Sequence, residues 1–404
     1  MRRFPSVPLV VSAWALLFSP AAFAAAPDPQ PPDLGEEVAR LRDELQAVRR
    51  DYEQKITALE ARLDALQKAP APPEAPPPPA PLPSSKVFNP DIAAIGDFLG
   101  AAGKSPGGGE PSIEMHEAEL SLQAIVDPYA RADVFLTFGP DEVGVEEAYA
   151  TFPALPGGFL LKVGKQRDVF GKVDGMHNHV MPWTDRPLVT RNLTGGEDGL
   201  SDSGVTLSRL IPVPGLFLEA TGQVYRGESE VFKAPTRGDL AYVGHLKAYR
   251  DLTESSNVEL GGSIAYGHNG VRADTTTRLL GVDATFRYRP LRRAIYTRFL
   301  ARGEAVWSRR SENRDAPQAF GAYGFLEYQF ARRWFAGLRY DHADRADTPS
   351  LTDKGGSALL TFWPSEFSQV RAQFRHTRFG EGQTANELLF QLLFAIGAHG
   401  AHPF

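Results

Sequence analysis

Five basic side chains gather around one long stretch, residues 168–203, that lacks a regular pattern. They are Lys165, Arg167, Lys172, Arg186 and Arg191. If the stretch folds into a narrow channel, these cations would attract anions by focusing the electric field in a low-dielectric throat. Six carboxylates lie among them: Asp168, Asp174, Asp185, Glu197, Asp198 and Asp202. An exposed loop that neutralises its own charge is therefore the alternative to a basic constriction.

Two histidines, His177 and His179, flank Asn178 inside the same stretch. A His-x-His pair on extended backbone places both rings on one side, which is a common part of a zinc site. A second pair, His399 and His402, closes the chain. Neither pair has an evident third ligand in the sequence. We therefore expect solvated histidines, with a metal site at His177 and His179 as the alternative.

The sequence carries none of the common enzymatic motifs. It has no Gly-x-Ser-x-Gly elbow, no phosphate-binding Walker loop and no His-Glu-x-x-His pair. The absence of cysteine excludes disulfides and thiolate metal sites. A formal charge of -6 argues against nucleic acid as a partner. We expect a protein that is not an enzyme and needs no cofactor.

The elements that must position these side chains are strands with two different faces. In residues 369–377, Val370 and Phe374 alternate with Arg371 and Arg375. A period of two indicates a strand. Arginines on the face opposite an apolar row fit a wall with lipid outside and water inside. Arg371 and Arg375 are therefore predicted to line a lumen.

Similar segments recur along the chain and predict a 16-stranded antiparallel transmembrane β-barrel over residues 91–404. They are 91–99, 112–126, 129–139, 143–153, 159–167, 204–211, 217–227, 240–250, 256–266, 278–290, 293–308, 318–330, 332–342, 356–364, 367–379 and 386–397. All except 204–211, which has eight residues, reach the roughly 9 to 11 residues of a membrane-spanning strand.

On the predicted lumen faces, the further arginines are Arg131, Arg298, Arg302 and Arg339. Carboxylates such as Glu119, Glu147 and Glu304 share these faces. A ladder of arginines would favour anions, whereas a mixed wall of ion pairs would have no net preference. Both interpretations stay open from the sequence.

The N-terminus predicts export. Arg2 and Arg3 precede an apolar run over residues 9–18, and Ala22-Phe23-Ala24 matches an A-x-A cleavage site. We assign residues 1–24 to a signal peptide. No later segment has the 18 consecutive apolar residues of a transmembrane helix.

Between the signal peptide and the barrel, the sequence predicts a coiled coil at 33–68 and a linker at 69–90. Apolar residues step by four and three along a heptad seam, with one stutter after Tyr52. A single amphipathic helix docked elsewhere is the alternative. The Pro/Ala tract at 69–83 forms neither helix nor sheet and is expected to be an extended spacer.

Residues 160–171 read Leu-Leu-Lys-Val-Gly-Lys-Gln-Arg-Asp-Val-Phe-Gly. This resembles the Gly-Lys/Arg…Phe-Gly segment of the phosphate-selective porins of the O and P type. The resemblance implies a trimeric 16-stranded barrel whose long loop, here 168–203, folds inward. The terminal Phe404 partly resembles the signal that outer-membrane barrels present to their assembly machinery.

The sequence therefore predicts an outer-membrane porin of a Gram-negative-type bacterium, in contact with outer-membrane lipid. It would allow passive diffusion of small polar or anionic solutes, with phosphate-like anions one possibility. We expect a homotrimer whose coiled coil lies in the periplasm and reaches toward peptidoglycan. The alternatives are a structural outer-membrane tether and a receptor specific for a ligand or metal.

Overall fold

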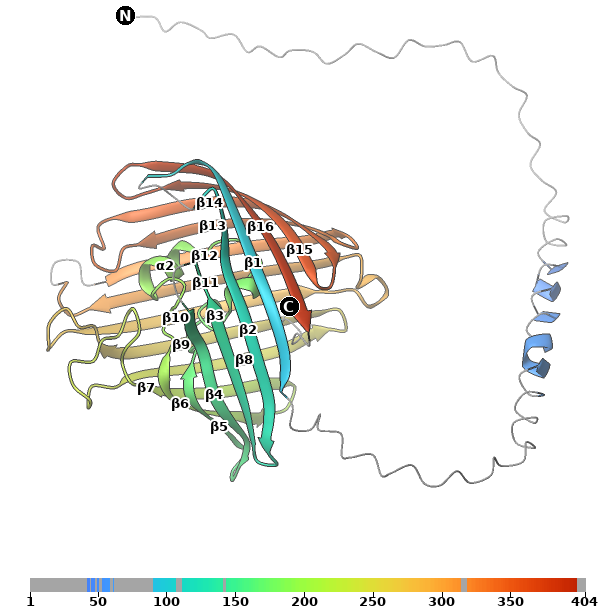
Figure 1. Ribbon diagram of the computed structural model, residues 1–404, viewed down its shortest axis with the longest axis horizontal. Helices are drawn as coiled ribbons and strands as arrows, with labels where there is room; N and C mark the ends of the chain where they lie inside the picture. The colour runs from blue at the N-terminus through green and yellow to red at the C-terminus, as the bar shows by residue number, and fades with distance from the viewer. Residues whose placement is uncertain are drawn as a thin grey trace, which may run out of the picture. The chain divides into compact units, whose positions relative to one another are not determined.

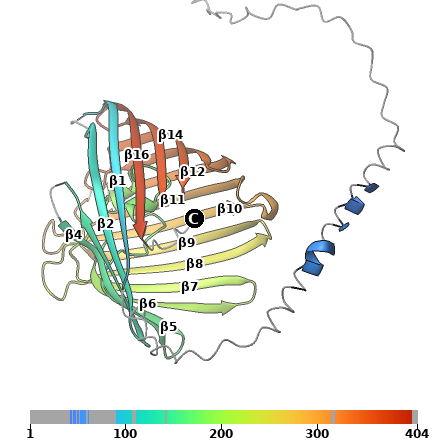
Figure 2. The same ribbon diagram turned by 45° about the vertical axis from the view of Figure 1, so that its right-hand side comes forward.

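The computed structural model describes residues 90–397 apart from 107–110, 141–142 and 314–317, together with short helical pieces between residues 42 and 61. Sixteen strands form one closed barrel (Figures 1 and 2). They are β1 (Asp91–Lys104), β2 (Ile113–Asp127), β3 (Ala130–Phe138), β4 (Val143–Leu155), β5 (Phe159–Gln166), β6 (Asp202–Val213), β7 (Leu216–Tyr225), β8 (Ala241–Thr253), β9 (Ser256–His268), β10 (Thr276–Tyr288), β11 (Arg298–Arg310), β12 (Gln318–Ala331), β13 (Trp334–Asp344), β14 (Thr352–Ser365), β15 (Ser368–Arg378) and β16 (Thr384–Gly397).

Every strand pairs antiparallel with its neighbours in sequence, and β1 pairs with β16 to close the sheet. Closure leaves no free strand edge, which a bilayer requires. The predicted fold class of the barrel is confirmed, and each predicted segment overlaps one strand. The predicted start at residue 293 is wrong, because Leu291–Arg293 forms the short helix η4 after Pro290 and β11 begins at Arg298.

The two ends of the barrel differ in the length of their connections. At one end, the short-turn end, connections such as Glu254–Ser255 and Glu366–Phe367 join strands directly, and both the start of β1 and the end of β16 lie there. The opposite end, the loop end, carries the longer connections, including 226–240 and 345–351.

The faces of the strands are inverted relative to a soluble protein. In β15, Val370 and Phe374 are exposed by 42% and 49%, whereas Arg371 and Gln373 are buried. The same inversion holds in β16, where Leu388, Phe390 and Leu392 are exposed and Gln391 is buried. The apolar face therefore points out of the barrel and the polar face points in.

Two β-bulges break this alternation near the loop end. In β2 the register with β1 shifts after Asp97, so that His116 becomes an extra residue beside Glu117. In β4 the register with β3 shifts after Phe135, so that Glu146 becomes an extra residue beside Glu147. A bulge re-aims a side chain, and here both members of each adjacent pair contact groups inside the barrel.

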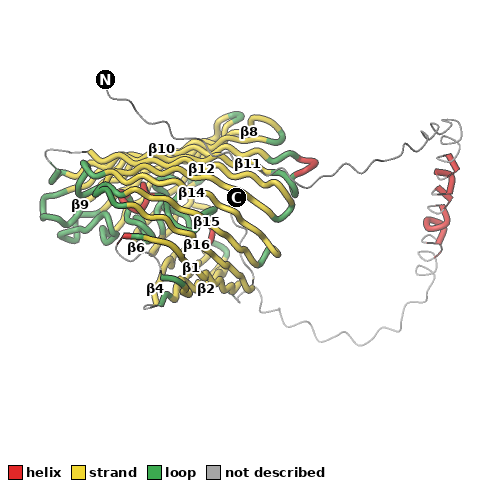
Figure 3. The backbone as a smooth tube through the Cα atoms, turned by 90° about the horizontal axis from the view of Figure 1, so that it is seen from above, coloured by secondary structure: helices red, strands yellow, loops and turns green. Residues whose placement is uncertain are grey.

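The connection between β5 and β6, residues 167–201, contains the short helices η3 (Asn178–Val180) and α2 (Leu188–Leu193). Helix α2 lies inside the barrel against β11, β12, β13 and β14 (Figures 1 and 3). We call residues 167–201 the inner loop. Its buried apolar side chains join inward residues of the wall in one hydrophobic core.

The N-terminal predictions lie largely outside the described residues. The signal peptide, the segment 69–89 and the terminal His399, His402 and Phe404 all fall there. The described pieces between 42 and 61 are helical, and the chain divides into two units, Met1–Leu82 and Pro83–Phe404. Among the described residues, no helix is long and apolar enough to cross a membrane.

Candidate functional site

The inner loop is bound to the inward face of the wall through its backbone. Its N–H groups donate to wall side chains on four strands: Val169 to Gln223 (2.9 Å), Gly171 to Ser263 (2.9 Å), Thr184 to Gln373 (2.9 Å) and Leu188 to Asp341 (3.2 Å). These bonds satisfy donors that a loop inside a barrel would otherwise leave unpaired. The loop therefore crosses and narrows the lumen.

An ion-pair cluster fixes the middle of the inner loop. Asp185 Oδ1 accepts from Arg339 Nη2 at 3.0 Å, and Asp185 Oδ2 accepts from Arg375 Nη1 at 2.8 Å. Burial alone would raise the pKa of Asp185, but the charges of Arg339 and Arg375 outweigh it and hold the pKa below the usual range. Two predicted lumen arginines thus share one loop carboxylate, and each also pairs with a carboxylate of the wall, Arg339 with Asp341 at 2.7 Å and Arg375 with Glu387 at 2.6 Å.

Two arginines of the loop itself organise its backbone. Arg186 donates to the carbonyl oxygens of Val173 (3.2 Å) and Met176 (2.7 Å), and burial lowers its pKa to about 10. Arg167 is buried and donates to Glu146 and to the carbonyl oxygen of Glu197 (3.0 Å). Their guanidinium groups supply hydrogen bonds to an irregular backbone that lies away from water.

Apolar packing holds the other side of the inner loop. Trp183 makes edge contacts with Phe325 and Tyr323, with ring centroids 4.9 and 5.3 Å apart. Gly321 of β12 gives the loop room, because a Cβ atom there would lie 2.8 Å from Val189 Cγ2. A larger residue at this position would push α2 away from the wall.

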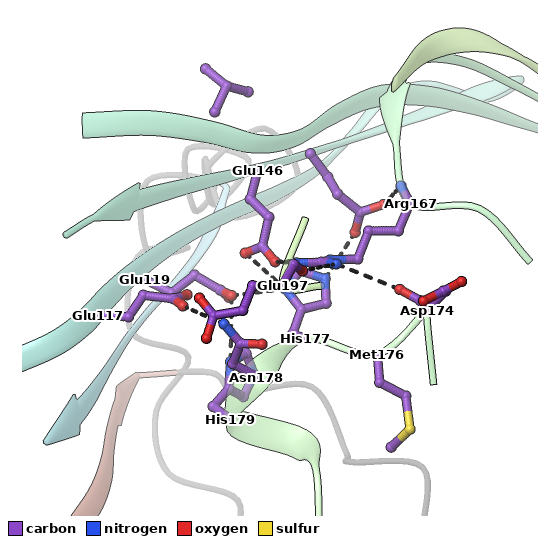
Figure 4. Close-up of polar contacts among 12 residues, drawn as sticks. Glu117, Glu119, Glu146, Arg167, Asp174, Met176, His177, Asn178, His179 and Glu197 are labelled. Carbon is purple, nitrogen blue, oxygen red and sulfur yellow. Dashed lines mark hydrogen bonds and ion pairs between the residues drawn. The ribbon is translucent and has the colours of Figure 1, made fainter. Parts of the chain in front are cut away.

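His177 of the inner loop lies among three carboxylates (Figure 4). Its Nδ1 lies 2.9 Å from Glu119 Oε2 and 3.1 Å from Glu146 Oε2, and its Nε2 lies 2.9 Å from Glu147 Oε2. Burial would lower the pKa of His177, but these hydrogen bonds outweigh burial and raise it well above the usual value. His179 Nδ1 lies 3.4 Å from Glu119 Oε2.

Glu146 and His116 were not among the site residues predicted from the sequence. Strict alternation places Glu146 on the lipid face, whereas the bulge in β4 turns it inward. The available signal was the adjacent pair Glu146-Glu147, since two consecutive carboxylates on a membrane strand would put one in lipid. The bulge in β2 likewise turns His116 inward, and its Nε2 lies 3.6 Å from Glu197 Oε1.

The space inside the barrel carries opposite charge at its two ends. At the loop end a pocket of about 790 Å³ includes Glu117, Glu146, Glu197, Asp198, Asp202, Glu228 and Glu230 in its lining, against Lys165, Arg167 and Arg226. A pocket of about 260 Å³ near the short-turn end is lined by Arg287, Arg289, Arg298 and Arg302, against Glu327. A third, of about 270 Å³, shares His116 and Glu197 with the first.

The predicted cationic residues occupy two kinds of place. Lys165, Arg191, Arg298 and Arg302 line pockets. Others are held by polar partners of the wall or loop: Arg131 by Asp133, Lys172 by Glu259, Arg339 and Arg375 by Asp185, and Arg371 by Gln391. Two belong to both groups, because Arg167 lines a pocket and pairs with Glu146, and Arg186 lines a pocket and donates to loop carbonyls. The structure brings the cations of the inner loop and the wall together without making one continuous basic ring.

No family model matches the chain. A protein of Aquifex aeolicus, described as uncharacterized, is 31% identical over 417 residues, covering 86% of this chain and 84% of that protein.

Solved structures share the fold at low identity. OmpT of Vibrio cholerae with loop L8 deleted is 12% identical (77% of this chain, all of that chain, TM-score 0.53). OmpF of Salmonella typhi, in complex with daunomycin, is 10% identical (77% and 99%, TM-score 0.53). The outer membrane channel DcaP of Acinetobacter baumannii is 10% identical (76% and 97%, TM-score 0.50). The barrel therefore has the fold of outer-membrane porins and channels.

Proposed function

We propose that this chain, which belongs to one family with the Aquifex aeolicus protein, is an outer-membrane porin that lets small solutes diffuse through its lumen. The observation that carries the proposal is the inverted barrel, with an apolar outer face and a polar inner face. Such a wall is stable only with hydrocarbon outside and water inside. Likeness to porin structures supports the same function.

The charge distribution supports small polar or anionic solutes. Arg287, Arg289, Arg298 and Arg302 face one pocket near the short-turn end. Guanidinium groups recognise oxyanions such as phosphate or carboxylate through paired donors. The carboxylates at the loop end oppose this preference, so we expect weak anion selectivity. A phosphate-like solute is one member of that class.

We further propose a homotrimer with a periplasmic coiled coil that reaches toward peptidoglycan. One solved form of the similar OmpT is a trimer. On the helical pieces of this chain, the seam residues Leu45 and Ile56 are exposed by 72% and 54%. Other copies of the helix would cover them in a coiled coil. Short turns of outer-membrane barrels face the periplasm, and the start of β1 lies at the short-turn end.

A structural tether is the second candidate function. It is favoured by the core of the inner loop, where Phe170, Trp183 and Val189 are fully buried inside the barrel. A barrel occluded by such a core would anchor the N-terminal segment without conducting. The two candidates differ in a single measurable property, which is ion conductance.

Single-channel recording of the purified full chain in a planar bilayer tests the proposal. We expect discrete conductance steps and a reversal potential of anionic sign under a salt gradient. Arg298→Ala should shift the reversal potential toward cations, whereas Arg250→Ala, which removes the same charge from an exposed position on β8, should not. Absence of steps would overturn the channel and leave the tether. A cationic reversal potential in the unaltered protein would overturn only the anion preference.

A further inference from the structure

We propose that Glu119, Glu146, His177 and His179 form a binding site for one divalent transition-metal ion inside the barrel (Figure 4). The site joins β2, β4 and the inner loop, because each of these three segments supplies at least one ligand. It goes beyond the proposed porin function. A metal ion here would bind whether or not the barrel conducts.

The donor atoms are spaced as a metal ion would hold them. His177 Nδ1 lies 2.9 Å from Glu119 Oε2 and 3.1 Å from Glu146 Oε2, and His179 Nδ1 lies 3.4 Å from Glu119 Oε2. With metal–ligand bonds of about 2.0 to 2.1 Å, a tetrahedral site separates neighbouring donors by about 3.3 Å. These three separations are therefore already close to the spacing of a tetrahedral site.

The ligands are themselves oriented by supporting groups. In the metal-bound form, the N–H of His177 Nε2 would donate to Glu147 Oε2, which lies 2.9 Å away, and the lone pair of Nδ1 would point toward the ion. This arrangement is the carboxylate–histidine–metal triad found at zinc sites. Glu147 Oε1 accepts from the backbone N–H of Arg167 at 2.7 Å. The Arg167 side chain donates to Glu146 Oε1, leaving Glu146 Oε2 for the ion.

Two imidazole nitrogens and two carboxylate oxygens select the class of ion. Imidazole suits Zn²⁺, Cu²⁺ and Ni²⁺, whereas Mg²⁺ and Ca²⁺ take oxygen ligands. The side chains of Glu119 and His179 are nearly buried and that of His177 is 15% exposed. Glu117 and Glu146 line the pocket at the loop end, and they would attract a cation from there toward the ligands.

A Co²⁺ titration of the full chain tests the site. Protein without an affinity tag, treated with chelator in detergent, is titrated while visible ligand-field absorption is recorded. All variants carry His399→Ala and His402→Ala, because that terminal pair could bind metal by itself. We expect one Co²⁺ per chain, a four-coordinate spectrum and displacement by Zn²⁺. The variants Glu119→Gln and His179→Gln should each weaken binding by about tenfold or more.

The matched control is His376→Gln, a histidine on the outer side of β15 that contacts Asn386. It should bind Co²⁺ like the parent protein. Heat-modifiable gel migration verifies that each variant retains its barrel. Glu119→Gln is nearly isosteric, so it tests the site even where a histidine variant fails to fold. The proposal is overturned by the lack of stoichiometric binding, or by equal affinity in the parent, Glu119→Gln and His179→Gln.

Discussion

The arginines inside the barrel differ in how deeply they are buried and in the groups that they contact. Arg339 and Arg375 are buried against Asp185, and Arg186 is buried against loop carbonyls. Arg298 is half-buried, lines a pocket and donates to the carbonyl oxygen of Ala294 at 3.1 Å. Removing a buried partner weakens the attachment of the loop to the wall, whereas removing a residue at a pocket changes the field in the lumen. Mutations in the two groups should therefore give different kinds of effect.

The first prediction concerns Asp185→Asn. The change removes the carboxylate that Arg339 and Arg375 share, while Arg339 keeps Asp341 and Arg375 keeps Glu387 as partners. It should therefore destabilise the docked inner loop by about 1.5 to 3 kcal/mol, the range for a hydrogen bond to a charged group. Hydrogen exchange of residues 167–201 in the folded barrel measures this effect. Asp198→Asn, which alters an exposed carboxylate of the same loop, is the control. Equal protection in both variants would contradict the role given to Asp185.

The stability of the inner loop depends on pH, because the loop contains buried carboxylates whose pKa values are raised. Burial raises the pKa of Asp174 to about 7, and the nearby charges of Arg186 and Arg167 only partly oppose this rise. Burial and the charge of Asp174 likewise raise the pKa of Asp168. The folded loop therefore holds these protons more tightly than an unfolded loop would.

The second prediction follows from the upward direction of these pKa shifts. Since the folded-state pKa exceeds the unfolded value of 3.8, the loop is most stable below about pH 4 with respect to Asp174, and it loses stability as pH rises through about 7. Hydrogen exchange of the inner loop, corrected for intrinsic rates, should show falling protection from pH 4 to 8. Asp174→Asn should flatten this slope. Rising protection over the same range would refute the prediction.

The strands give a third prediction, set by their lipid face. Leu338 lies near the middle of β13 and is 60% exposed. Leu338→Arg would place a charge near the bilayer midplane and should cost about 2 to 4 kcal/mol of folding free energy. Reversible denaturant unfolding in lipid vesicles measures the change. Thr348→Arg, in the exposed connection between β13 and β14, should leave stability within about 0.5 kcal/mol.

The fourth prediction concerns the whole molecule. Deletion of residues 25–83 should leave barrel folding and conductance intact, because the strands β1 to β16 close the barrel among themselves. If the segment forms a coiled coil, oligomers extracted in mild detergent should weaken and attachment to peptidoglycan should decrease. Native mass measurement and envelope fractionation check both outcomes. Unchanged oligomer mass together with unchanged attachment would argue against the coiled coil.

The architecture could be predicted from the sequence because a barrel wall is a local pattern. A period of two in a segment such as 369–377 reports which side chains face lipid, and it needs no knowledge of distant residues. The same alternation in sixteen segments specified the strand number and the inward direction of Arg371 and Arg375. The length of the stretch after β5 indicated a functional loop.

The site could not be predicted in the same way, because its contacts join residues far apart in the sequence. Arg375 pairs with Asp185 across 190 positions, and His177 pairs with Glu119 across 58. Glu146 does not follow the alternation that predicted the two faces of the strands, because a bulge in β4 turns its side chain into the lumen. The sequence alone determined the strands, their faces and the presence of a charged inner segment. The tertiary structure decided which charges meet, because closing the barrel around the loop sets those distances.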